Sequence, residues 1–486
     1  MGALLLAFGT VMTVQAQRIA READRANRAA EAARRSAATA SRVSEFLIEM
    51  FKVSNPDATN ARKISARDLL DRGAARIQAE LKGEPLVRAE LMQAISQVYT
   101  NLGEYGEASS LSDDALQLRT GALGEDHPAV ADSLTALGDV HRRQSKFQRA
   151  EALHRRALAI RREQLGSEHP DTAQSLTRLA QLAYFAGDVE GARRTYQEAL
   201  EIQIAALGAE DLAVAETLVN VGWLENAEGK LSVAEEALRN ALRIREKKLG
   251  PEHHLVAETL EYLADNRIFS EIYGEAEALT QRAIGIWARV LDPTDLRSGS
   301  AMTKLGSIYR YQGEYEASVA ALQRAIGVLA EAGGDRGYEL GFAYLELGET
   351  YGATERWKEA AAALERCLAI YESVFGSDHP RTAQVLNNLG SMISDGGAPA
   401  RAEPYLRRAV NIFRPLEGNT YWKGLTQWSL ANSLRDQGKR GEAATWYRSA
   451  IILFERETRE GGGFRALSEL KADFAALSAR DEPPSE

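Results

Sequence analysis

The sequence predicts an all-α protein, built as an α-solenoid of about nine helical pairs, because three features recur every 42 residues. A six-residue phrase returns at that interval. An alanine keeps a fixed place within each interval, and a large residue followed by a small one keeps another. Repeats of about 20–50 residues are typical of arrays in which each unit buries its apolar face only against its neighbours. This regularity outweighs the division into about three domains that a length of 486 residues would suggest.

The recurring phrase marks the turn between one helical pair and the next. It begins at Leu123, Leu165, Leu207, Leu249, Leu291 and Phe375, and its fullest form is Leu-Gly-x-x-His-Pro. Proline suits the first turn of a helix, where a backbone N–H has no partner within the helix. We therefore expect a new helix to begin at Pro128, at Pro170 and at the equivalent residues of the other repeats.

Small residues at two fixed places predict close contact between helices. The alanine place holds Ala115, Ala157, Ala199, Ala241, Ala283, Ala325, Cys367, Ala409 and, one residue early, Ala450. The large-then-small place holds Ile95-Ser96, Leu137-Gly138, Leu179-Ala180, Val221-Gly222, Leu263-Ala264, Leu305-Gly306, Leu347-Gly348, Leu389-Gly390 and Leu430-Ala431. Apolar residues recur between them at helical spacing, and a larger side chain at either place would force two backbones apart. Cys367, the single cysteine, takes the alanine place, so we expect it to pack.

Glycines near the middle of the interval predict the break within each pair. Gly103, Gly187, Gly229 and Gly313 stand at one phase, and glycine readily takes the left-handed conformation that ends a helix. Each interval therefore holds two helices joined by a short turn.

These features resemble the 42-residue tetratricopeptide repeat of the kinesin-light-chain type, and the likeness covers about four-fifths of the chain. The resemblance implies a right-handed superhelix in which the first helix of each pair lines the concave face. We expect the solenoid to occupy residues 86–462. A linker and capping helix at 54–85 would precede it, and a C-terminal cap helix and acidic tail at 463–486 would follow it.

The segment ahead of the repeats carries a second resemblance. Phe46–Pro56, Ile64–Ile77 and Gly83–Pro85 are similar to the stretch that joins membrane helix to repeats in bacterial transmembrane serine/threonine kinases. In that family a cytoplasmic kinase domain comes first, followed by one membrane helix and then a tetratricopeptide array. This chain departs from the arrangement, because it begins at the membrane helix and has no room for a kinase.

Residues 1–16 have three possible interpretations. The apolar run Ala3–Val14 is 12 residues long, whereas a helix that spans a bilayer needs about 20. It is the end of a truncated membrane helix, a signal-peptide core or a short apolar helix end. We expect a membrane-associated chain with a single N-terminal anchor, and export is the alternative. Sidedness stays open, because the arginines from Arg18 to Arg28 favour the cytoplasm and the kinase arrangement favours the outside.

Residues 17–53 are expected to form a long Ala/Arg-rich helical stalk. Apolar and small residues follow a four-three spacing through residues 19–47, which is typical of a coiled-coil seam. We expect a homodimer through this seam. An uncoiled single helix, or one folded back on the repeats, is the alternative.

Composition and motifs predict a protein without catalytic, cofactor or metal residues. The 59 basic and 69 acidic residues give a net charge of −10, and no basic stripe indicates a nucleic-acid partner. His141–Arg143 and His154–Arg156 lack the aspartate of a kinase catalytic loop, and no glycine-rich phosphate loop occurs. His127 and His169 lie in successive repeats, about 10 Å apart, which is too far for shared zinc ligation. We expect these histidines to order turns.

The candidate binding residues come from the family resemblance. It implies that three rows of each first helix face the concave groove. From these rows we select Arg178, Phe185, Asn220, Trp223, Tyr262, Phe269, Lys304, Tyr311 and Asn388. The rows also contain Asp139 and Arg143. Asn220 and Asn388 match the asparagine that kinesin-light-chain repeats use to hold a peptide backbone. The alternative is that the rings simply pack between neighbouring first helices.

Two functions of different class follow. The first is a non-catalytic protein–protein interaction scaffold, tethered to a membrane or exported, which binds a protein or peptide in the concave groove. The alternative is the C-terminal sensor or interaction fragment of a bacterial serine/threonine kinase whose catalytic domain is absent from this chain.

Overall fold

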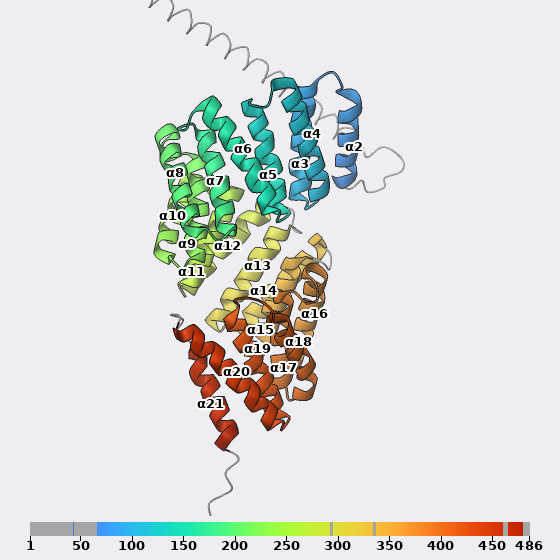
Figure 1. Ribbon diagram of the computed structural model, residues 1–486, viewed down its shortest axis with the longest axis vertical. Coiled ribbons are helices and arrows are strands. Elements are labelled where there is room, and N and C mark those ends of the chain that lie inside the picture. The colour runs from blue at the N-terminus through green and yellow to red at the C-terminus, as the bar shows by residue number, and fades with distance from the viewer. Residues whose placement is uncertain (1–41, 43–65, 292–294, 334–336, 460–464, 480–486) are drawn as a thin grey trace, which may run out of the picture. The chain divides into compact units, whose positions relative to one another are not determined.

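A computed structural model describes residues 42, 66–291, 295–333, 337–459 and 465–479, in which all the regular elements are α-helices (Figure 1). In chain order they are α2 (Ala66–Glu80), α3 (Pro85–Asn101), α4 (Tyr105–Leu123), α5 (Pro128–Arg143), α6 (Phe147–Leu165), α7 (Pro170–Phe185), α8 (Val189–Leu207), α9 (Leu212–Ala227), α10 (Leu231–Leu249), α11 (His254–Phe269), α12 (Tyr273–Val290), α13 (Leu296–Gln312), α14 (Tyr315–Gly333), α15 (Tyr338–Ala353), α16 (Trp357–Phe375), α17 (Pro380–Asp395), α18 (Pro399–Phe413), α19 (Thr420–Asp436), α20 (Arg440–Arg459) and α21 (Arg465–Ala479).

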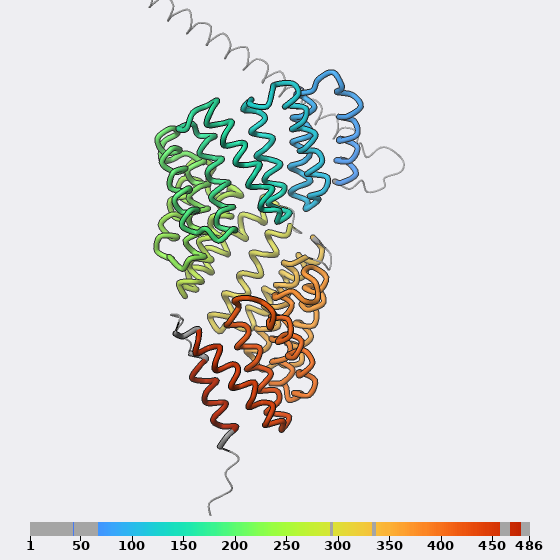
Figure 2. The backbone as a smooth tube through the Cα atoms, in the orientation of Figure 1, coloured from blue at the N-terminus to red at the C-terminus, as the bar shows by residue number. Residues whose placement is uncertain are grey.

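Within each unit, successive helices pack as helical hairpins, such as α3 with α4 and α19 with α20, which confirms the predicted all-α solenoid of paired helices (Figure 2). The chain divides into two compact units, and the boundary falls inside α9, between Asn220 and Val221. In the first unit α2 packs on α3, where Leu70 and Ile77 are buried. In the second unit α21 packs on α19 and α20 through Leu470 and Leu477.

The small residues lie where helices approach most closely. A Cβ atom placed on Gly306 of α13 would come within 2.5 Å of Cγ of Leu322 in α14, and Gly390 has the same relation to Leu406 at 2.5 Å. Residues of the alanine place are fully buried, including Cys367, and burial raises the pKa of its thiol. The small residues of the repeat are therefore required by packing, as the sequence indicated.

The turn between pairs is built by its glycine and its histidine. Gly166 and Gly376 have φ of 97° and 96°, a region that favours glycine. The next helix is then capped by histidine, whose Nδ1 accepts the backbone N–H two residues on. This bond is 3.1 Å at His127 and His379, and 3.2 Å at His169 and His253. The turn-ordering role predicted for these histidines therefore has a specific geometry, that of a helix N-cap.

Removing one such cap tests its contribution to stability. We expect His379→Ala to lower the free energy of unfolding by about 1 kcal/mol, because the N–H of Arg381 loses its acceptor. Burial and Arg381 lower the pKa of His379, so the cap is present above the ordinary histidine pKa and is lost as protonation removes the acceptor at lower pH. Urea unfolding at pH 7 and pH 5 measures this. His379→Asn, which keeps a cap acceptor that does not titrate, is expected to stay near wild type at pH 7 and to lose less stability than wild type between pH 7 and pH 5; a large loss in that variant at pH 7 would contradict the capping role.

Three predictions fall on residues that the structure does not describe. The apolar segment 1–16, the long helical stalk 17–53 and the pairing through residues 19–47 lie outside the described residues, except for Arg42, whose Nη2 lies 2.8 Å from Oε1 of Glu84.

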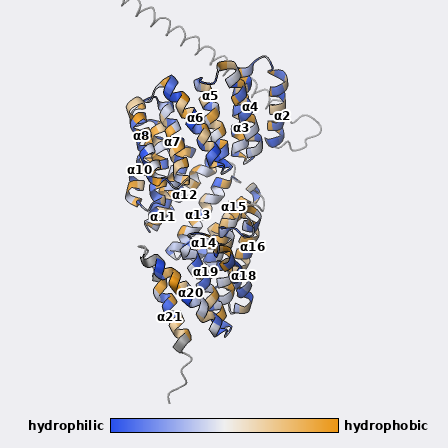
Figure 3. Ribbon diagram, in the orientation of Figure 1, coloured by the Kyte–Doolittle hydropathy of each residue, from blue (hydrophilic) through white to orange (hydrophobic). Residues whose placement is uncertain are grey.

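In the part of the chain that is described, hydrophilic residues interrupt every helix (Figure 3), and none of these helices has the length and hydrophobicity to cross a membrane.

Candidate functional site

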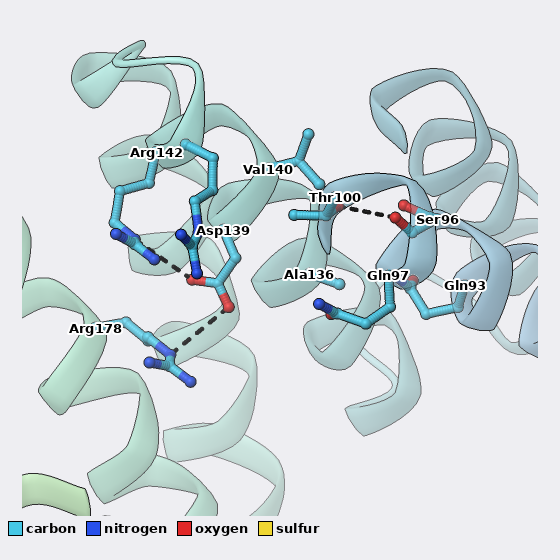
Figure 4. A pocket seen from close by; sticks show the side chains of 10 residues that line it. Gln93, Ser96, Gln97, Thr100, Ala136, Asp139, Val140, Arg142 and Arg178 are labelled. Carbon is cyan, nitrogen blue, oxygen red and sulfur yellow. Dashed lines mark hydrogen bonds and ion pairs between the residues drawn. The ribbon is translucent and has the colours of Figure 1, made fainter. Parts of the chain in front are cut away.

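A polar pocket of about 200 Å³ lies on the first helices of the first unit (Figure 4). It is lined by Gln93, Ser96, Gln97 and Thr100 of α3, by Ala136, Asp139, Val140, Arg142 and Arg143 of α5, and by Arg178 of α7. Residues 136, 139, 140 and 143 share one face of α5 because they are three or four positions apart. Three successive hairpins thus contribute their first helices to one site.

Asp139 lies between two arginines at the centre of this pocket. Its Oδ1 is 3.9 Å from Nε of Arg142, and its Oδ2 is 3.7 Å from Nε of Arg178 (Figure 4). Burial lowers the pKa of Arg142, and the positive charges of Arg143 and Arg178 lower it further, whereas Asp139 opposes the shift. The pocket therefore places the guanidinium groups of Arg142 and Arg178 beside one carboxylate, and Arg143 also lines it.

Several buried polar atoms here make no hydrogen bond within the described part of the chain. They are Oδ1 of Asp139, Nε of Arg142, Nε of Arg178, both ring nitrogens of His154 and the hydroxyl of Tyr196. Natural proteins leave few buried polar groups unpaired, so a cluster of them marks a place where stability alone does not explain the side chains.

His154 of α6 lies directly behind the pocket. Its ring is fully buried, and its Nε2 is 3.7 Å from Oδ1 of Asp139. Burial lowers its pKa to about 4; Asp139 opposes this shift, and Arg142, Arg161 and Arg178 add to it. The equivalent residue in four later repeats is leucine: Leu238, Leu322, Leu364 and Leu406. This repeat has a buried histidine where those four repeats have a hydrocarbon side chain.

Three of the residues selected from the sequence lie in the first unit, and in the structure each of them has different neighbours. Arg178 lies in the pocket and also reaches Glu216 of α9, with Nη2 3.3 Å from Oε1. Phe185, at the end of α7, stacks on Phe147 with ring centroids 5.1 Å apart. Asn220 uses its side-chain amide within its own helix, donating to the carbonyl of Glu216 at 3.0 Å. Only Arg178 belongs to the pocket.

Two selected residues of the second unit link neighbouring first helices. Nζ of Lys304 is 2.7 Å from Oδ1 of Asp265, and Nδ2 of Asn388 donates to Oε1 of Glu349 at 3.2 Å. Each pair is 39 residues apart, the same separation as Arg178 and Asp139 in the first unit. At this separation, a side chain of one first helix meets a side chain of the preceding first helix. These polar residues therefore hold adjacent repeats together.

The aromatic residues selected in the second unit differ in exposure. Trp223 and Tyr262 are half-buried, and burial raises the pKa of Tyr262 to about 12, with the carboxylates of Glu258 and Asp265 adding to the shift. Phe269 is 58% exposed and Tyr311 is 45% exposed, although Tyr311 also stacks on Tyr273 with centroids 5.4 Å apart. Phe185 and Tyr311 stack on rings of the second helices α6 and α12, whereas Phe269 offers an accessible apolar face.

The second unit also has buried acidic residues on its first helices. Nη2 of Arg310 lies 3.0 Å from Oε2 of Glu346 and 3.1 Å from Oε2 of Glu349. Burial and the neighbouring Glu346 raise the pKa of Glu349 to about 7, against the effect of Arg310. The first helices of the second unit thus place two carboxylates beside one arginine. The pocket of the first unit has three arginines and one carboxylate.

Sequence reasoning missed most of the pocket. Arg142 lies outside the three rows, and Gln93 and Gln97 belong to a repeat that the selection did not reach. The substitution of His154 for a recurring leucine was visible in the sequence and would have pointed to this region. Among the described residues, no group of His, Cys, Asp and Glu side chains is placed to hold a metal ion.

Comparison with known proteins identifies the repeat. The tetratricopeptide repeat profile matches residues 87–163, 142–205, 171–247, 256–331 and 339–414. No curated protein matches the chain.

Solved structures give similarities of fold. BtubC (BKLC) from P. vanneervenii is 22% identical over 45% of this chain and 89% of its own, with a TM-score of 0.37. A putative kinesin light chain from Podosopora anserina, with nearly identical TPR-like repeats, is 23% identical over 43% and 98%, with a TM-score of 0.37. The STAND protein PH0952 from Pyrococcus horikoshii, which has a tetratricopeptide repeat sensor, is 15% identical over 85% of this chain and 56% of its own, with a TM-score of 0.53.

The repeat profile matches more than half of the residues and follows the helical hairpins that the structure shows. The chain therefore belongs to the tetratricopeptide repeat family.

Proposed function

We propose that the chain is a non-catalytic scaffold that binds a polypeptide partner along the first helices of its repeats. The observation that carries this proposal is the pocket of the first unit, where buried polar atoms of Asp139, Arg142 and Arg178 lack hydrogen-bond partners within the described chain. A polypeptide supplies the missing donors and acceptors through its backbone and side chains. In the second unit, the exposed ring of Phe269 offers apolar area to a partner side chain.

The proposal includes a tether. The apolar residues 1–16 support attachment to a membrane, with export as the alternative, and the spacing in residues 19–47 supports a homodimer. The profile matches are confined to the repeats, which supports a binding role without a catalytic one.

A second candidate is the interaction part of a bacterial serine/threonine kinase. The similarity of Phe46–Pro56 and Ile64–Ile77 to the corresponding kinase segment favours it. Sequencing the DNA upstream of Met1 tests this candidate: an in-frame kinase domain is the expected finding, and a stop codon directly upstream would eliminate it.

The scaffold proposal predicts that Asn220→Ala combined with Trp223→Ala weakens partner binding. The two residues lie one turn apart on α9, and loss of a large ring and an amide at an interface is expected to weaken binding by roughly tenfold or more. Partner proteins are first captured on the immobilised chain from an extract of its own cells, and the affinity of each purified partner is then measured by calorimetry. Circular dichroism is expected to show unchanged helicity and a nearly unchanged melting temperature.

The matched control is Val233→Ala combined with Asn240→Ala, which removes an exposed apolar residue and an exposed asparagine from the second helix α10. This control is expected to bind as wild type does. If the α9 variant unfolds, its side chains belong to the core. If both variants bind equally well, the first helices do not carry the interface.

A further inference from the structure

We propose that the pocket formed by α7, α8 and α9 binds a guanidinium group of a ligand. This pocket shares no lining residue with the polar pocket of α3, α5 and α7, and the inference does not depend on the proposed function. The guanidinium group comes from an arginine side chain of a polypeptide or from a free guanidino compound, and the experiment below separates these sources.

The pocket lies in the first unit and has a volume of about 170 Å³. Its lining includes residues from all three helices: Asp171 and Gln174 of α7, Gln203 of α8, and Ala213, Glu216 and Thr217 of α9. The volume exceeds the share of about 30 Å³ that a water molecule takes in the liquid, so the pocket has room for a small planar group.

Other repeats hold a guanidinium group at the position of Gln203. Three repeats have arginine there, at Arg119, Arg161 and Arg245. These side chains are buried, with exposed fractions of 8%, 3% and 4%. A charged group is stable in such a place only where hydrogen-bond partners compensate for its lost hydration. The repeat therefore carries acceptors that fit a guanidinium group.

A side-chain hydroxyl group is the first of these acceptors. Nη1 of Arg161 donates to Oγ of Ser175 at 2.7 Å, and Nη1 of Arg245 donates to Oγ1 of Thr259 at 2.8 Å. The equivalent hydroxyl in the pocket belongs to Thr217.

A backbone carbonyl and a carboxylate are further acceptors. Nη1 of Arg245 also donates to the carbonyl of Leu255 at 2.8 Å and to Oε2 of Glu258 at 3.1 Å. The equivalent residues one repeat earlier are Ala213 and Glu216, and both line the pocket. The acceptors are thus present where the guanidinium group of the repeat itself is missing.

The preceding first helix keeps an acceptor but loses its charge. Arg119 and Arg161 pair with Glu90 and Asp132 at 3.3 and 2.7 Å, and the equivalent residue in the pocket is Gln174. The amide oxygen of a glutamine side chain is a neutral acceptor.

Gln203 leaves hydrogen-bonding capacity unused. Its side chain is 2% exposed, and its Oε1 has no hydrogen-bond partner in the described chain. Glutamine is shorter than arginine and carries a single amide, so it leaves part of the arginine site unfilled. Natural proteins leave few buried polar atoms unpaired, and a donor from a ligand would satisfy this oxygen.

The charge of the lining favours a cation. Asp171 and Glu216 line the pocket, and none of its described lining residues is basic. Oε1 of Glu216 is shared with Arg178, whose Nη2 lies 3.3 Å away. The carboxylate of Asp171 lies 3.6 Å from Nδ1 of His169 and pairs with no arginine or lysine in the described part of the chain. A planar guanidinium group presents several N–H donors to such acceptors, and charge-assisted hydrogen bonds are among the strong ones in proteins.

The test titrates the full chain with small probes and follows the NMR signals of each probe. Arginine, citrulline and lysine are each used in free form and in a capped form, with an N-terminal acetyl group and a C-terminal methylamide. Citrulline has the shape of arginine without its positive charge, and lysine has the charge without the planar donors. We expect an arginine probe to bind at least about tenfold more tightly than its citrulline and lysine counterparts. Tighter binding of the capped form indicates a polypeptide, and tighter binding of the free form indicates a small compound.

Gln203→Arg is the diagnostic variant, because it fills the pocket with a guanidinium group of the chain itself, as Arg161 and Arg245 do in their repeats. It is expected to lose at least about tenfold in affinity for the arginine probes and to melt no lower than wild type. Gln197→Arg is the matched control, since it adds the same charge on the exposed side of the same helix. This control is expected to bind as wild type does.

A second variant carries the test if Gln203→Arg does not fold. Glu216→Gln replaces a half-exposed carboxylate by an amide of the same shape. It is expected to lose roughly tenfold in affinity for the arginine probes, because a charge-assisted hydrogen bond becomes a neutral one.

The other outcomes overturn the inference. Citrulline or lysine probes that bind as tightly as arginine would show that no guanidinium group is recognised, and so would an absence of binding. An unchanged affinity of Gln203→Arg would show that the probes bind elsewhere. The scaffold proposal is tested separately, through Asn220 and Trp223, and it stands or falls without this pocket.

Discussion

Replacing Gly306 by leucine is expected to lower the free energy of unfolding by about 1–3 kcal/mol. Gly306 of α13 faces Leu322 of α14, and a Cβ atom at this position would lie 2.5 Å from Cγ of that leucine. Even alanine must therefore displace Leu322, and a larger side chain forces the two helices of the hairpin apart. Because each repeat is stabilised through its neighbours, the loss extends to adjacent hairpins.

Gly327 provides a control within the same hairpin. It lies on the exposed side of α14, and a Cβ atom placed there meets nothing within 4 Å. Gly327→Ala is expected to stabilise the protein by about 0.5–1 kcal/mol, because alanine restricts the unfolded chain more than glycine does. Urea unfolding of the variants measures both effects. A Gly306→Leu variant as stable as wild type would show that the predicted close approach of α13 and α14 is wrong.

The second large effect is expected at the buried histidine. His154→Leu should raise the free energy of unfolding by about 1–3 kcal/mol at pH 7, because neither nitrogen of the buried ring has a hydrogen-bond partner in the described chain. Leucine is also the natural residue here in four later repeats, where it packs against the glycine that corresponds to Gly138. The substitution thus restores the packing that the array uses elsewhere.

The same variant should remove part of the pH dependence of stability. The folded protein holds the pKa of His154 near 4, whereas the ordinary value is 6.5. Between these values the unfolded chain binds a proton that the folded chain does not, so wild type loses up to about 3 kcal/mol as pH falls from 6.5 to 4. Burial has the opposite effect at Glu349, where the raised pKa makes folding more favourable as pH falls below about 7. The difference between His154→Leu and wild type isolates the histidine.

Unfolding in urea at pH 7 and pH 5 measures this difference. The gain in stability from His154→Leu is expected to be larger at pH 5 than at pH 7. An equal gain at both values would mean that His154 titrates normally in the folded protein. A loss of stability would mean that the ring makes favourable interactions with Asp139 that leucine cannot replace.

The fold was predictable because the same weak sequence signal recurs at a fixed interval along the chain. One Leu-Gly pair says little, but small residues at one phase over nine intervals restrict the packing to one arrangement. Gly306 and Gly390 lie against Leu322 and Leu406 as that arrangement requires. The histidine of the turn phrase was assigned correctly to turn order, although its role as an N-cap acceptor became clear only from the position of Nδ1.

The candidate site was less predictable, because the position of a side chain on a helix does not determine which residues it contacts. Lys304 and Asn388 were selected as groove residues, and both use their polar atoms on the preceding repeat. Phe185 was selected as a binding ring and stacks on Phe147. The arginine pocket depends on side chains from three helices, and Arg142 joins it from outside the rows that the resemblance implied.

Site-specific photo-crosslinking in living cells tests the binding role of the first helices most directly. Photoreactive p-benzoylphenylalanine replaces Gln97 of α3 in one strain and Gln197 of α8 in another. Both glutamines are exposed, and each donates only to a side chain four residues on in its own helix, Asn101 or Glu201. We predict that position 97 yields a discrete crosslinked partner, that Arg143→Ala diminishes this product, and that position 197 yields none. Equal products at both positions, or none at position 97, would contradict the account.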